Sequence, residues 1–253
     1  MRQVDPSAER GLVVVVPTFQ ERQTLEALVE GIFDAVSGAF VLVVDDASTD
    51  GTSELADRLA QGNTRVHVLH RPGKLGLGTA YVDGFAWALD QGFERVAQMD
   101  ADLSHDPRDL PRLLAALDEG ADLAIGSRNV LGGGVVGWGL GRHILSKGGS
   151  LYARTWLGSR VRDLTSGFKA MTRSALVTID PGTLRSNGYA FQIEATFRAE
   201  VHGLRVVELP IAFTDRRVGQ SKMSRRIFAE AITGVVRMRL GRRDLAIRTN
   251  RPV

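Results

Sequence analysis

The sequence contains no cysteine, and this absence excludes disulfide bonds, thiolate zinc sites and cysteine nucleophiles. It also lacks an uninterrupted apolar run of about 18 residues, the length that a membrane-spanning helix needs. Met1 to Asp5 show no apolar signal-peptide region. The five histidines have no metal-ligand spacing, and the Gly-x-x-x-x-Gly-Lys-Ser/Thr pattern of a P-loop does not occur. We therefore expect a cytoplasmic protein without a membrane span.

The charge of the chain is nearly balanced in total but uneven in distribution. The formal net charge is +3, yet the segment from Arg216 to Val253 holds eleven lysines and arginines against two acids, Glu230 and Asp244. Such a segment favours an anionic surface, either lipid headgroups or nucleic acid. A solvated basic tail is the alternative for residues 242–253. Because the basic residues are not interleaved with aromatic ones, we expect no nucleic-acid partner.

The length of 253 residues and a hydrophobic content of 43% suit a single globular domain with a C-terminal appendage. We expect an N-terminal tail at 1–10, a catalytic domain at 11–223, an amphipathic helix at 224–241 and a basic tail at 242–253. Ile227, Phe228, Ile232 and Val235 give that helix an apolar face opposite basic residues. This face either packs on the domain or, together with Trp138, lies on a membrane surface.

Strands and helices alternate along the first half of the chain. Runs of β-branched and aliphatic residues predict strands that are buried on both faces, and the stretches between them have helical spacing. This alternation predicts an α/β fold: a Rossmann-like, mostly parallel sheet with flanking helices. Strands are expected at 12–16, 40–44, 66–69, 96–99 and 123–126, helices at 24–36, 52–60, 78–89, 110–117, 142–156 and 190–202, and further strands within 163–171 and 206–213. The stretch Asn129–Gly141, with six glycines, is expected to be a mobile loop over the site.

Two carboxylates, Asp100 and Asp102, stand where the apolar strand 96–99 gives way to a turn. Such a pair can hold a hard divalent cation through oxygen ligands, and that cation can neutralise a bound diphosphate. Because the carboxyl ends of parallel strands share one edge of a sheet, the loops after 12–16 and 40–44 are expected to lie beside the pair. Asp45 and Asp46, in the second loop, are adjacent carboxylates that need a donor or cation, which a nucleoside would supply.

Several polar residues of these loops also have purely structural interpretations. Ser48, Thr49 or Asp50, and Asp106 before Pro107, are placed to cap the helices that follow them. His105 is expected to bond locally. Arg128 and Arg142 flank the glycine-rich stretch, and a guanidinium fork suits a phosphate group; for each arginine alone, a solvated surface charge is the alternative.

Four segments resemble the family 2 glycosyltransferases of GT-A fold and, more narrowly, the dolichyl- or polyprenyl-phosphate mannose synthases. These segments are Val15 to Arg22, Val44 to Thr52, Lys74 to Tyr81 and Met99 to Pro107, and the agreement continues through Gly126–Arg128, Gly132–Gly134, Trp138, Arg142, Asp163–Phe168 and Gly219–Lys222. The resemblance implies transfer of mannose from GDP-mannose to a polyprenyl (dolichyl) monophosphate, with inversion at the anomeric carbon.

The resemblance also implies roles for individual residues. Asp100 and Asp102 would hold Mg²⁺ or Mn²⁺, with the role of Ser104 left open. Arg128, Arg142 and Ser146 would bind the acceptor phosphate, so that Asp102, Arg128 and Arg142 are the expected catalytic residues. Donor-binding residues would be Pro17, Phe19, Glu21, Asp46, Lys74, Asp100 and Lys222. For Lys74, capping of a tight turn is the alternative.

The implied partners are GDP-mannose, a polyprenyl phosphate and the inner face of the cytoplasmic membrane, with a membrane protein as a possible anchor. Two other functions stay open on the sequence. One is a glucosyltransferase that uses UDP-glucose. The other is a non-catalytic nucleotide-binding protein, against which the intact Asp100, Asp102, Arg128 and Arg142 argue.

Overall fold

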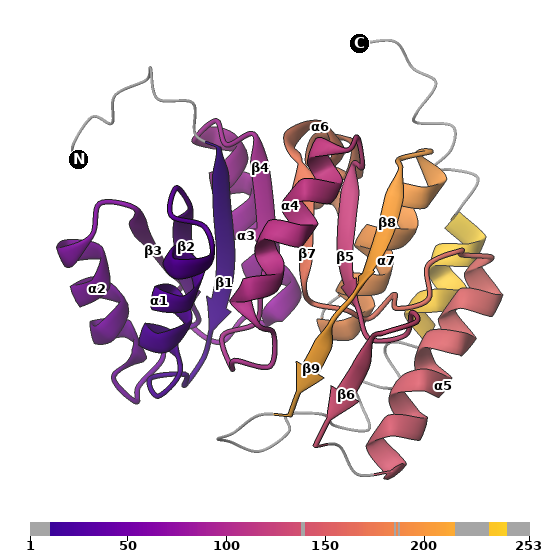
Figure 1. Ribbon diagram of the computed structural model, residues 1–253, viewed down its shortest axis with the longest axis horizontal. Coiled ribbons are helices and arrows are strands. Elements are labelled where there is room, and N and C mark those ends of the chain that lie inside the picture. Colours follow the sequence, from indigo (N-terminus) through magenta and orange to yellow (C-terminus); the bar gives the residue numbers. More distant parts are fainter. Residues whose placement is uncertain (1–10, 138–139, 185, 187, 216–232, 242–253) are drawn as a thin grey trace.

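The computed structural model describes residues 11–137, 140–184, 186, 188–215 and 233–241, with the backbone alone for 140–146 and 189. A seven-stranded sheet in the order β3-β2-β1-β4-β7-β5-β8 forms its centre (Figure 1). Within this sheet β7 is antiparallel to both of its neighbours, and the other six strands run in one direction. The strands are β1 (Leu12–Thr18), β2 (Phe40–Asp45), β3 (Val66–His70), β4 (Arg95–Gln98), β5 (Leu123–Ser127), β7 (Lys169–Thr172) and β8 (Val206–Pro210), and a separate pair consists of β6 (Gly134–Val136) and β9 (Ala212–Thr214).

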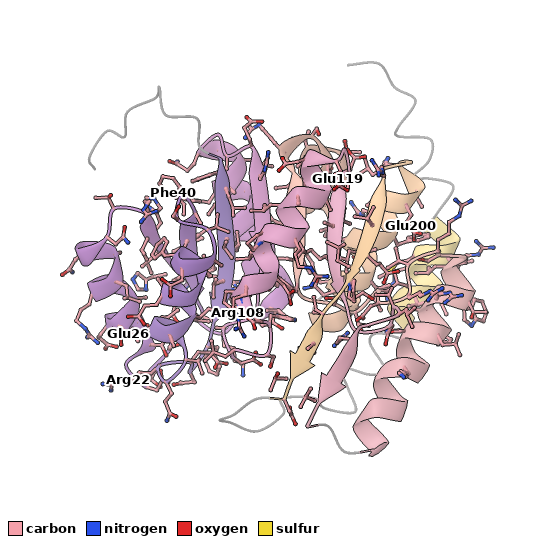
Figure 2. The ribbon with its side chains drawn as sticks, viewed as in Figure 1. Arg22, Glu26, Phe40, Arg108, Glu119 and Glu200 are labelled. Atoms are coloured by element: carbon pink, nitrogen blue, oxygen red, sulfur yellow. The ribbon has the colours of Figure 1, made fainter. Side chains whose placement is uncertain are left out.

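Helices cover both faces of the sheet, and each face has its own apolar core. The helices are α1 (Leu25–Ala35), α2 (Thr52–Gly62), α3 (Leu77–Asp90), α4 (Leu110–Asp118), α5 (Leu140–Leu157), α6 (Arg173–Ile179) and α7 (Gly188–Val201), with two short 3₁₀ turns at Pro107–Asp109 and Pro181–Thr183. One core lies beneath α1, α2 and α4, and the other beneath α3, α5, α6 and α7. Glu26, Arg108 and Glu119 are exposed on the outside of the first layer (Figure 2).

The sequence of each element accounts for its place in these layers. Residues 12–16 of β1 are fully apolar and buried on both faces of the sheet, as expected for a central parallel strand. On α1 the buried residues recur at helical spacing, at Leu25, Leu28, Val29 and Ile32. Such spacing turns one side of the helix toward the sheet and leaves the other side in solvent.

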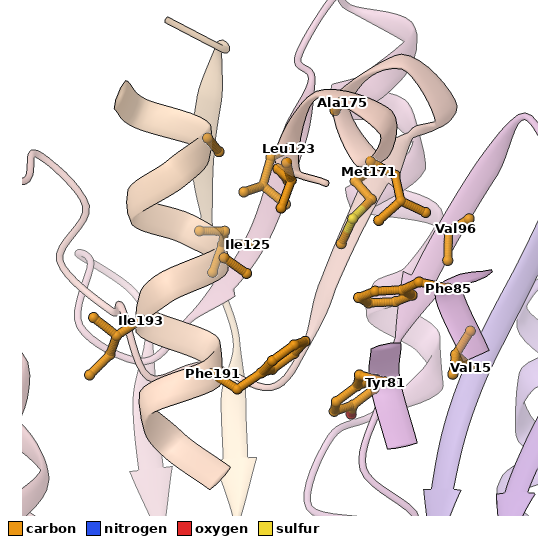
Figure 3. Close-up of a cluster of buried hydrophobic side chains, with 14 of the residues drawn as sticks. Val15, Tyr81, Phe85, Val96, Leu123, Ile125, Met171, Ala175, Phe191 and Ile193 are labelled. Carbon is orange, nitrogen blue, oxygen red and sulfur yellow. The ribbon is translucent and has the colours of Figure 1, made fainter. Parts of the chain in front are cut away.

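A glycine allows α3 to approach the sheet closely. A Cβ atom added to Gly84 would lie 2.4 Å from Cγ1 of Val15 on β1. On the same helix, Tyr81 stacks on Phe191 of α7 at a centroid distance of 5.7 Å, and the Phe85 ring lies tilted to Phe191 at 6.4 Å (Figure 3). The close approach and the ring contacts together fix α3 and α7 on the same face of the sheet.

The predicted strands and helices of the first half are confirmed, with ends that differ by a few residues. The description of Asn129–Gly141 as a loop is wrong in part, because Gly134–Val136 forms strand β6, paired in parallel with β9. Helix α6 was not predicted from the sequence, because its seven residues are too few to show a helical period. Thr172 caps this helix, since its Oγ1 accepts a hydrogen bond from the Ala175 amide at 3.1 Å.

The predicted C-terminal amphipathic helix is described only at residues 233–241, which are helical. Val235 and Met238 are buried in the core beneath α5 and α7, and a Cβ atom at Gly234 would lie 3.6 Å from Cβ of Ala190. This stretch therefore packs on the domain, which is the first of the two roles considered for it. Across the described residues, no helix is both long and apolar enough to cross a membrane.

Candidate active site

The loops that follow β1, β2, β3, β4 and β5 all leave the same edge of the sheet, because these strands are parallel. The segment that leads into the antiparallel β7 reaches this edge from the opposite direction. The edge lies at the bottom of Figure 1. It gathers every candidate site residue whose side chain the structure describes.

Asp100 lies at the centre of this edge, directly after β4. Its Oδ1 accepts a hydrogen bond from the Tyr81 hydroxyl at 3.2 Å, and its side chain keeps 30% of its surface exposed. Its carboxylate also lies against Gly167, where an added Cβ atom would be 3.1 Å from Oδ2. Neither contact was predicted from the sequence, although Tyr81 and Gly167 both lie within the segments that resemble the glycosyltransferase family.

Asp102 and Ser104 complete an oxygen-rich corner beside Asp100. Asp102 is 5% exposed, and its Oδ1 accepts the Ser104 amide hydrogen bond at 3.0 Å. Ser104 Oγ is buried and has no hydrogen-bond partner among the described residues. A buried hydroxyl without a partner is costly, so a ligand that binds oxygen would relieve that cost.

The donor set of this corner fits Mg²⁺ or Mn²⁺. In the described part of the chain, no group of three or more His, Cys, Asp or Glu side chains could hold a metal ion. A cation here would therefore take its carboxylate oxygens from Asp100 and Asp102. Ser104, water and a ligand's phosphates would supply the remaining oxygens. That pattern is the usual one for Mg²⁺ bound with a nucleotide.

His105 supports the backbone of the acidic pair and bonds locally, as predicted. Its Nδ1 accepts a hydrogen bond from the Asp100 amide at 3.5 Å. The ring is buried, stacks on Phe168 at 5.2 Å and meets the Phe213 ring edge-on at 5.2 Å. Burial lowers the pKa of His105 despite the nearby carboxylates, so the neutral ring is the form that packs here.

The two adjacent carboxylates after β2 both find their donors within the protein. Asp45 is fully buried and accepts hydrogen bonds from Ser48 Oγ at 2.7 Å, Ser53 Oγ at 2.5 Å and Thr18 Oγ1 at 2.9 Å. Burial acts to raise the pKa of Asp45, but these hydrogen bonds outweigh it and the pKa is lowered. Asp45 therefore stabilises the loop that carries its neighbour.

Asp46 is paired with an arginine that the sequence analysis did not single out. Arg71, which follows β3, donates from Nη1 to Asp46 Oδ1 at 2.6 Å, and both side chains are buried. The Gly76 amide donates to Asp46 Oδ2 at 3.0 Å, and Thr79 Oγ1 lies 2.5 Å from Arg71 Nη2. The inference that Asp46 needs a nucleoside as its donor is thus wrong, since Arg71 neutralises it. The pair instead ties the loop that carries Lys74 to β2.

Phe19 and Lys74, both predicted to bind the donor, lie together. The Lys74 ammonium is 4.1 Å from the centroid of the Phe19 ring, a cation–π contact between the loops after β1 and β3. Pro17 and Glu21 are partly buried on the same side, and the Glu21 amide donates to Thr52 Oγ1 at 2.9 Å. These contacts bring four of the predicted donor-binding residues to one end of the edge.

Arg128 forms a buried ion pair instead of the solvated charge considered for it. Its Nε and Nη2 donate to the two carboxylate oxygens of Asp163 at 2.7 and 2.6 Å, and Nη2 also donates to Thr165 Oγ1 at 2.8 Å. Asp163 is 0% exposed. Burial acts to raise the pKa of Asp163, but the Arg128 charge and hydrogen bonds have the larger, opposite effect. The pKa of Asp163 therefore lies below its usual value.

The capping predictions have mixed outcomes. Asp106 does cap the 3₁₀ turn that follows it, because its Oδ1 accepts the Arg108 amide hydrogen bond at 3.0 Å. Gly51 is the N-cap of α2, and Asp50 instead accepts the Thr52 amide at 3.1 Å. The Ser48 hydroxyl donates instead to Asp45. These residues therefore stabilise the loops at the site edge.

The structure does not describe the side chains of three predicted site residues. Arg142 and Ser146 lie on α5, for which the backbone alone is described at these positions, and Lys222 lies outside the described residues. Their roles stay predictions.

Known proteins similar to this chain support the same interpretation. The model of glycosyl transferase family 2 matches residues 13–179. The chain is 46% identical over 232 residues to the undecaprenyl-phosphate mannosyltransferase of Micrococcus luteus, with 92% of this chain and 95% of that protein covered. It is 48% identical over 236 residues to the polyprenol monophosphomannose synthase of Mycolicibacterium smegmatis, with 92% and 89% covered.

Solved structures of more distant proteins share the fold. The glucosyl-3-phosphoglycerate synthase of Mycobacterium tuberculosis, in complex with Mn²⁺, UDP and glucosyl-3-phosphoglycerate, superposes with a TM-score of 0.66 at 23% identity, over 92% of this chain and 81% of that one. The mannosyltransferase PcManGT of Pyrobaculum calidifontis, in complex with GDP-Man and Mn²⁺, gives a TM-score of 0.55 at 16% identity, over 97% and 74%. With its α/β sheet, its acidic edge and these two full-length relatives, the chain belongs to glycosyl transferase family 2, among the polyprenyl-phosphate mannose synthases.

Proposed function

We propose that this protein transfers a mannosyl group from GDP-mannose to a polyprenyl monophosphate. The observation that carries the proposal is the oxygen corner of Asp100, Asp102 and the Ser104 hydroxyl, which has no hydrogen-bond partner among the described residues. The chain is also 46% and 48% identical to two polyprenyl-phosphate mannosyltransferases. A phosphate oxygen of the acceptor forms a bond to the anomeric carbon of mannose. The bond between that carbon and the diphosphate oxygen breaks, and GDP leaves.

The acidic pair assists the departure of GDP. Asp100 and Asp102 would hold Mg²⁺ or Mn²⁺, which would supply charge neutralisation for the diphosphate leaving group. Two proteins of the same fold, the glucosyl-3-phosphoglycerate synthase and PcManGT described above, were solved in complex with Mn²⁺ and with UDP or GDP-Man. His105 keeps the backbone of Asp100 in place, and Tyr81 orients one oxygen of its carboxylate.

The other end of the site binds the donor, and the residues near α5 bind the acceptor. Pro17, Phe19, Glu21 and Asp46 line the nucleoside pocket, with Lys74 and Lys222 near the donor phosphates. Arg142 and Ser146 bind the acceptor phosphate. Because a phosphate monoester has a second pKa near 6, the acceptor is already largely ionised at neutral pH, and no strong general base is needed.

Arg128 contributes to acceptor binding through the structure around it. Its Nε and Nη2 hold Asp163 in the floor of the site and its guanidinium lies 5.3 Å from the Phe213 ring of β9. This network fixes the start of the segment that leads through β6 to α5, the helix that carries Arg142 and Ser146.

We propose that the protein acts peripherally on the inner face of the cytoplasmic membrane, where its acceptor lies. The outer side of α5 exposes Leu151 and Trp156, at 61% and 50%, and carries Lys147 and Arg154 without an acidic residue. Apolar and basic side chains together favour an anionic bilayer. Flotation with anionic vesicles tests this proposal. Binding that occurred only with an added membrane protein would indicate a protein anchor instead of direct contact with the bilayer.

Transfer of radiolabelled mannose tests the proposed activity. GDP-mannose is incubated with a polyprenyl phosphate in detergent, with Mn²⁺, with Mg²⁺ or with a chelator, and labelled lipid is measured. We expect labelled product only with a divalent cation. Asp102→Asn should lower turnover about 100-fold or more, whereas Asp106→Asn, a change in the same loop at a capping residue, should retain most of it. Absence of product beside an active UDP-glucose reaction would establish the glucosyltransferase instead.

A further inference from the structure

A buried polar cluster lies behind the acidic pair and borders the apolar core beneath α3 and α7. Its members are Gln98 of β4, Lys169 of β7 and Gln192 of α7, which are 0, 1 and 2% exposed. In the register of the sheet Gln98 stands opposite Lys169. Their neighbours on the same strand faces, Val96 and Met171, belong to the apolar core under α3 and α7.

Hydrogen bonds join the cluster into one chain. Lys169 Nζ donates to the backbone oxygen of Gln192 at 3.0 Å and to its Oε1 at 2.9 Å. Gln98 Nε2 donates to the same Oε1 at 2.7 Å and to the Gly167 carbonyl at 3.1 Å. The chain therefore runs from a lysine in the core to the backbone of Gly167.

Gly167 is the point at which this chain reaches the acidic pair. An added Cβ atom at Gly167 would lie 3.1 Å from Asp100 Oδ2 and 3.2 Å from Oδ1. The Asp100 carboxylate thus lies directly on the Gly167 backbone, whose carbonyl is held by Gln98. Because the two groups are in such close contact, we expect a displacement of Gly167 to displace the carboxylate as well.

A second contact connects the same turn of α7 to Asp100. Phe191, next to Gln192, stacks on the Tyr81 ring at 5.7 Å and 8° (Figure 3). The Tyr81 hydroxyl donates to Asp100 Oδ1. One carboxylate is therefore fixed from two sides by consecutive residues of one helix.

The position of a lysine here has a cost that packing alone does not explain. Within the described residues, no carboxylate lies within ion-pair distance of Lys169 Nζ, and burial lowers its pKa to about 7. An apolar side chain of similar volume fills such a position without the cost of desolvating an amine. Lys169 provides a hydrogen-bond donor to both carbonyl oxygens of Gln192, and a methionine at this position would not.

We propose that Lys169 and Gln192 are positioning residues that hold the Asp100 carboxylate in its metal-binding geometry through Gln98 and Gly167. This inference rests on the proposed function, because it takes Asp100 and Asp102 as the cation ligands. Groups that hold metal ligands in place affect metal affinity by about 10–100-fold when they are removed.

Direct Mn²⁺ binding in the presence of GDP tests the inference without reference to turnover. Free Mn²⁺ is measured by electron paramagnetic resonance, and the melting temperature is recorded for every variant. Lys169→Met and Gln192→Leu remove the links at nearly constant volume, and we expect each to weaken Mn²⁺ binding about tenfold. Gln192→Glu keeps an acceptor oxygen at the same place, and we expect it to bind Mn²⁺ as the wild type does.

Met171→Ala is the matched control. Met171 lies two residues along β7 on the same buried face, 2% exposed, but outside the hydrogen-bonded chain. We expect it to lower the melting temperature while leaving Mn²⁺ affinity within about twofold of wild type, since a lost core contact costs stability alone. Equal weakening by Met171→Ala, or unchanged affinity in both Lys169→Met and Gln192→Leu, would overturn the inference.

Gly167→Ala tests the last link should the core variants not fold. Its Cβ presses on the Asp100 carboxylate, so Mn²⁺ affinity should fall, while Gly62→Ala, where no atom lies within 4 Å, should have no effect. Normal affinity in Gly167→Ala would also overturn the inference. Failure of the wild type to bind Mn²⁺, or normal binding by Asp102→Asn, would instead refute the metal site and with it the proposed function.

Discussion

Removal of the Arg128 side chain should destabilise the fold far more than removal of an exposed arginine. Arg128→Ala leaves the Asp163 carboxylate, 0% exposed, with the Arg128 amide and the Thr165 hydroxyl as remaining donors. Breaking a buried ion pair from one side costs about 3–5 kcal/mol. For a chain of this size each kcal/mol lowers the melting temperature by about 2–4 °C, so we expect a decrease of about 6–20 °C.

Arg108→Ala is the control for this experiment. Arg108 also pairs with a carboxylate, at 2.5 Å from Asp106, but its side chain is 86% exposed. Exposed pairs contribute little to stability, because water screens both charges, and the hydrogen bond from the Arg108 amide to Asp106 survives the change. The free energy of unfolding is measured in urea for both variants. If Arg128→Ala is no more destabilised than Arg108→Ala, the buried pair is not a structural element and Arg128 is available for the acceptor.

The pH dependence provides an independent check of the same pair. The pKa of Asp163 is lowered from its ordinary value of 3.8, because the Arg128 charge and hydrogen bonds outweigh the effect of burial. A carboxyl group with a lowered pKa contributes stability above its unfolded pKa and loses it as the pH falls through the folded pKa. The difference in unfolding free energy between wild type and Arg128→Ala should therefore narrow as the pH falls below about 4. A constant difference across that range would contradict the assignment.

Three further changes follow from single contacts. Because burial lowers the pKa of Lys169 from 10.5 to about 7, wild type should gain unfolding free energy relative to Lys169→Met as the pH rises from about 7 to 10.5. Urea unfolding measures this difference, and a difference that did not change with pH would contradict a buried lysine. Gly84→Ala should cost about 1–3 kcal/mol, because its Cβ would lie 2.4 Å from Val15 Cγ1, while Gly62→Ala should not destabilise. Phe19→Leu removes the cation–π contact with Lys74 and should raise the KM for GDP-mannose about threefold with little change in kcat; an unchanged KM would place the nucleoside elsewhere.

The parts of the fold that the sequence predicted are those with a strong local pattern. The buried runs of β1 and β2 and the helical spacing of α1 were sufficient for the sheet and its direction. The strand β6 was not predictable, because Gly134–Val136 has no local signal and becomes a strand only by pairing with β9, more than seventy residues later. Long-range pairing is a property of the assembled chain, and a window of sequence does not contain it.

The candidate site shows the same division between local and distant information. The loops and their acidic residues were found from strand ends, whereas the contact between Phe19 and Lys74 was not predicted, although both had been named as donor-binding residues. The partners of the charges were not found, since Arg71 is 25 residues from Asp46 and Asp163 is 35 residues from Arg128. Periodicity identifies which residues are buried, but the ion pair that makes burial of a charge tolerable depends on which elements are neighbours in the sheet.

The backbone of the site edge connects these observations. The first, second and fourth strands are each followed by a non-glycine residue in the left-handed region, at Gln20, Ala47 and Leu103, with φ of 60°, 54° and 58°. Each such residue costs free energy, so the surrounding contacts must hold it. Ser48 bonds the Gln20 amide, the Asp45 network encloses Ala47, and Ser104 bonds Asp102 across Leu103. The loops are therefore held by the protein's own hydrogen bonds before any ligand binds. Binding free energy is then available for the donor and the acceptor rather than for ordering the site.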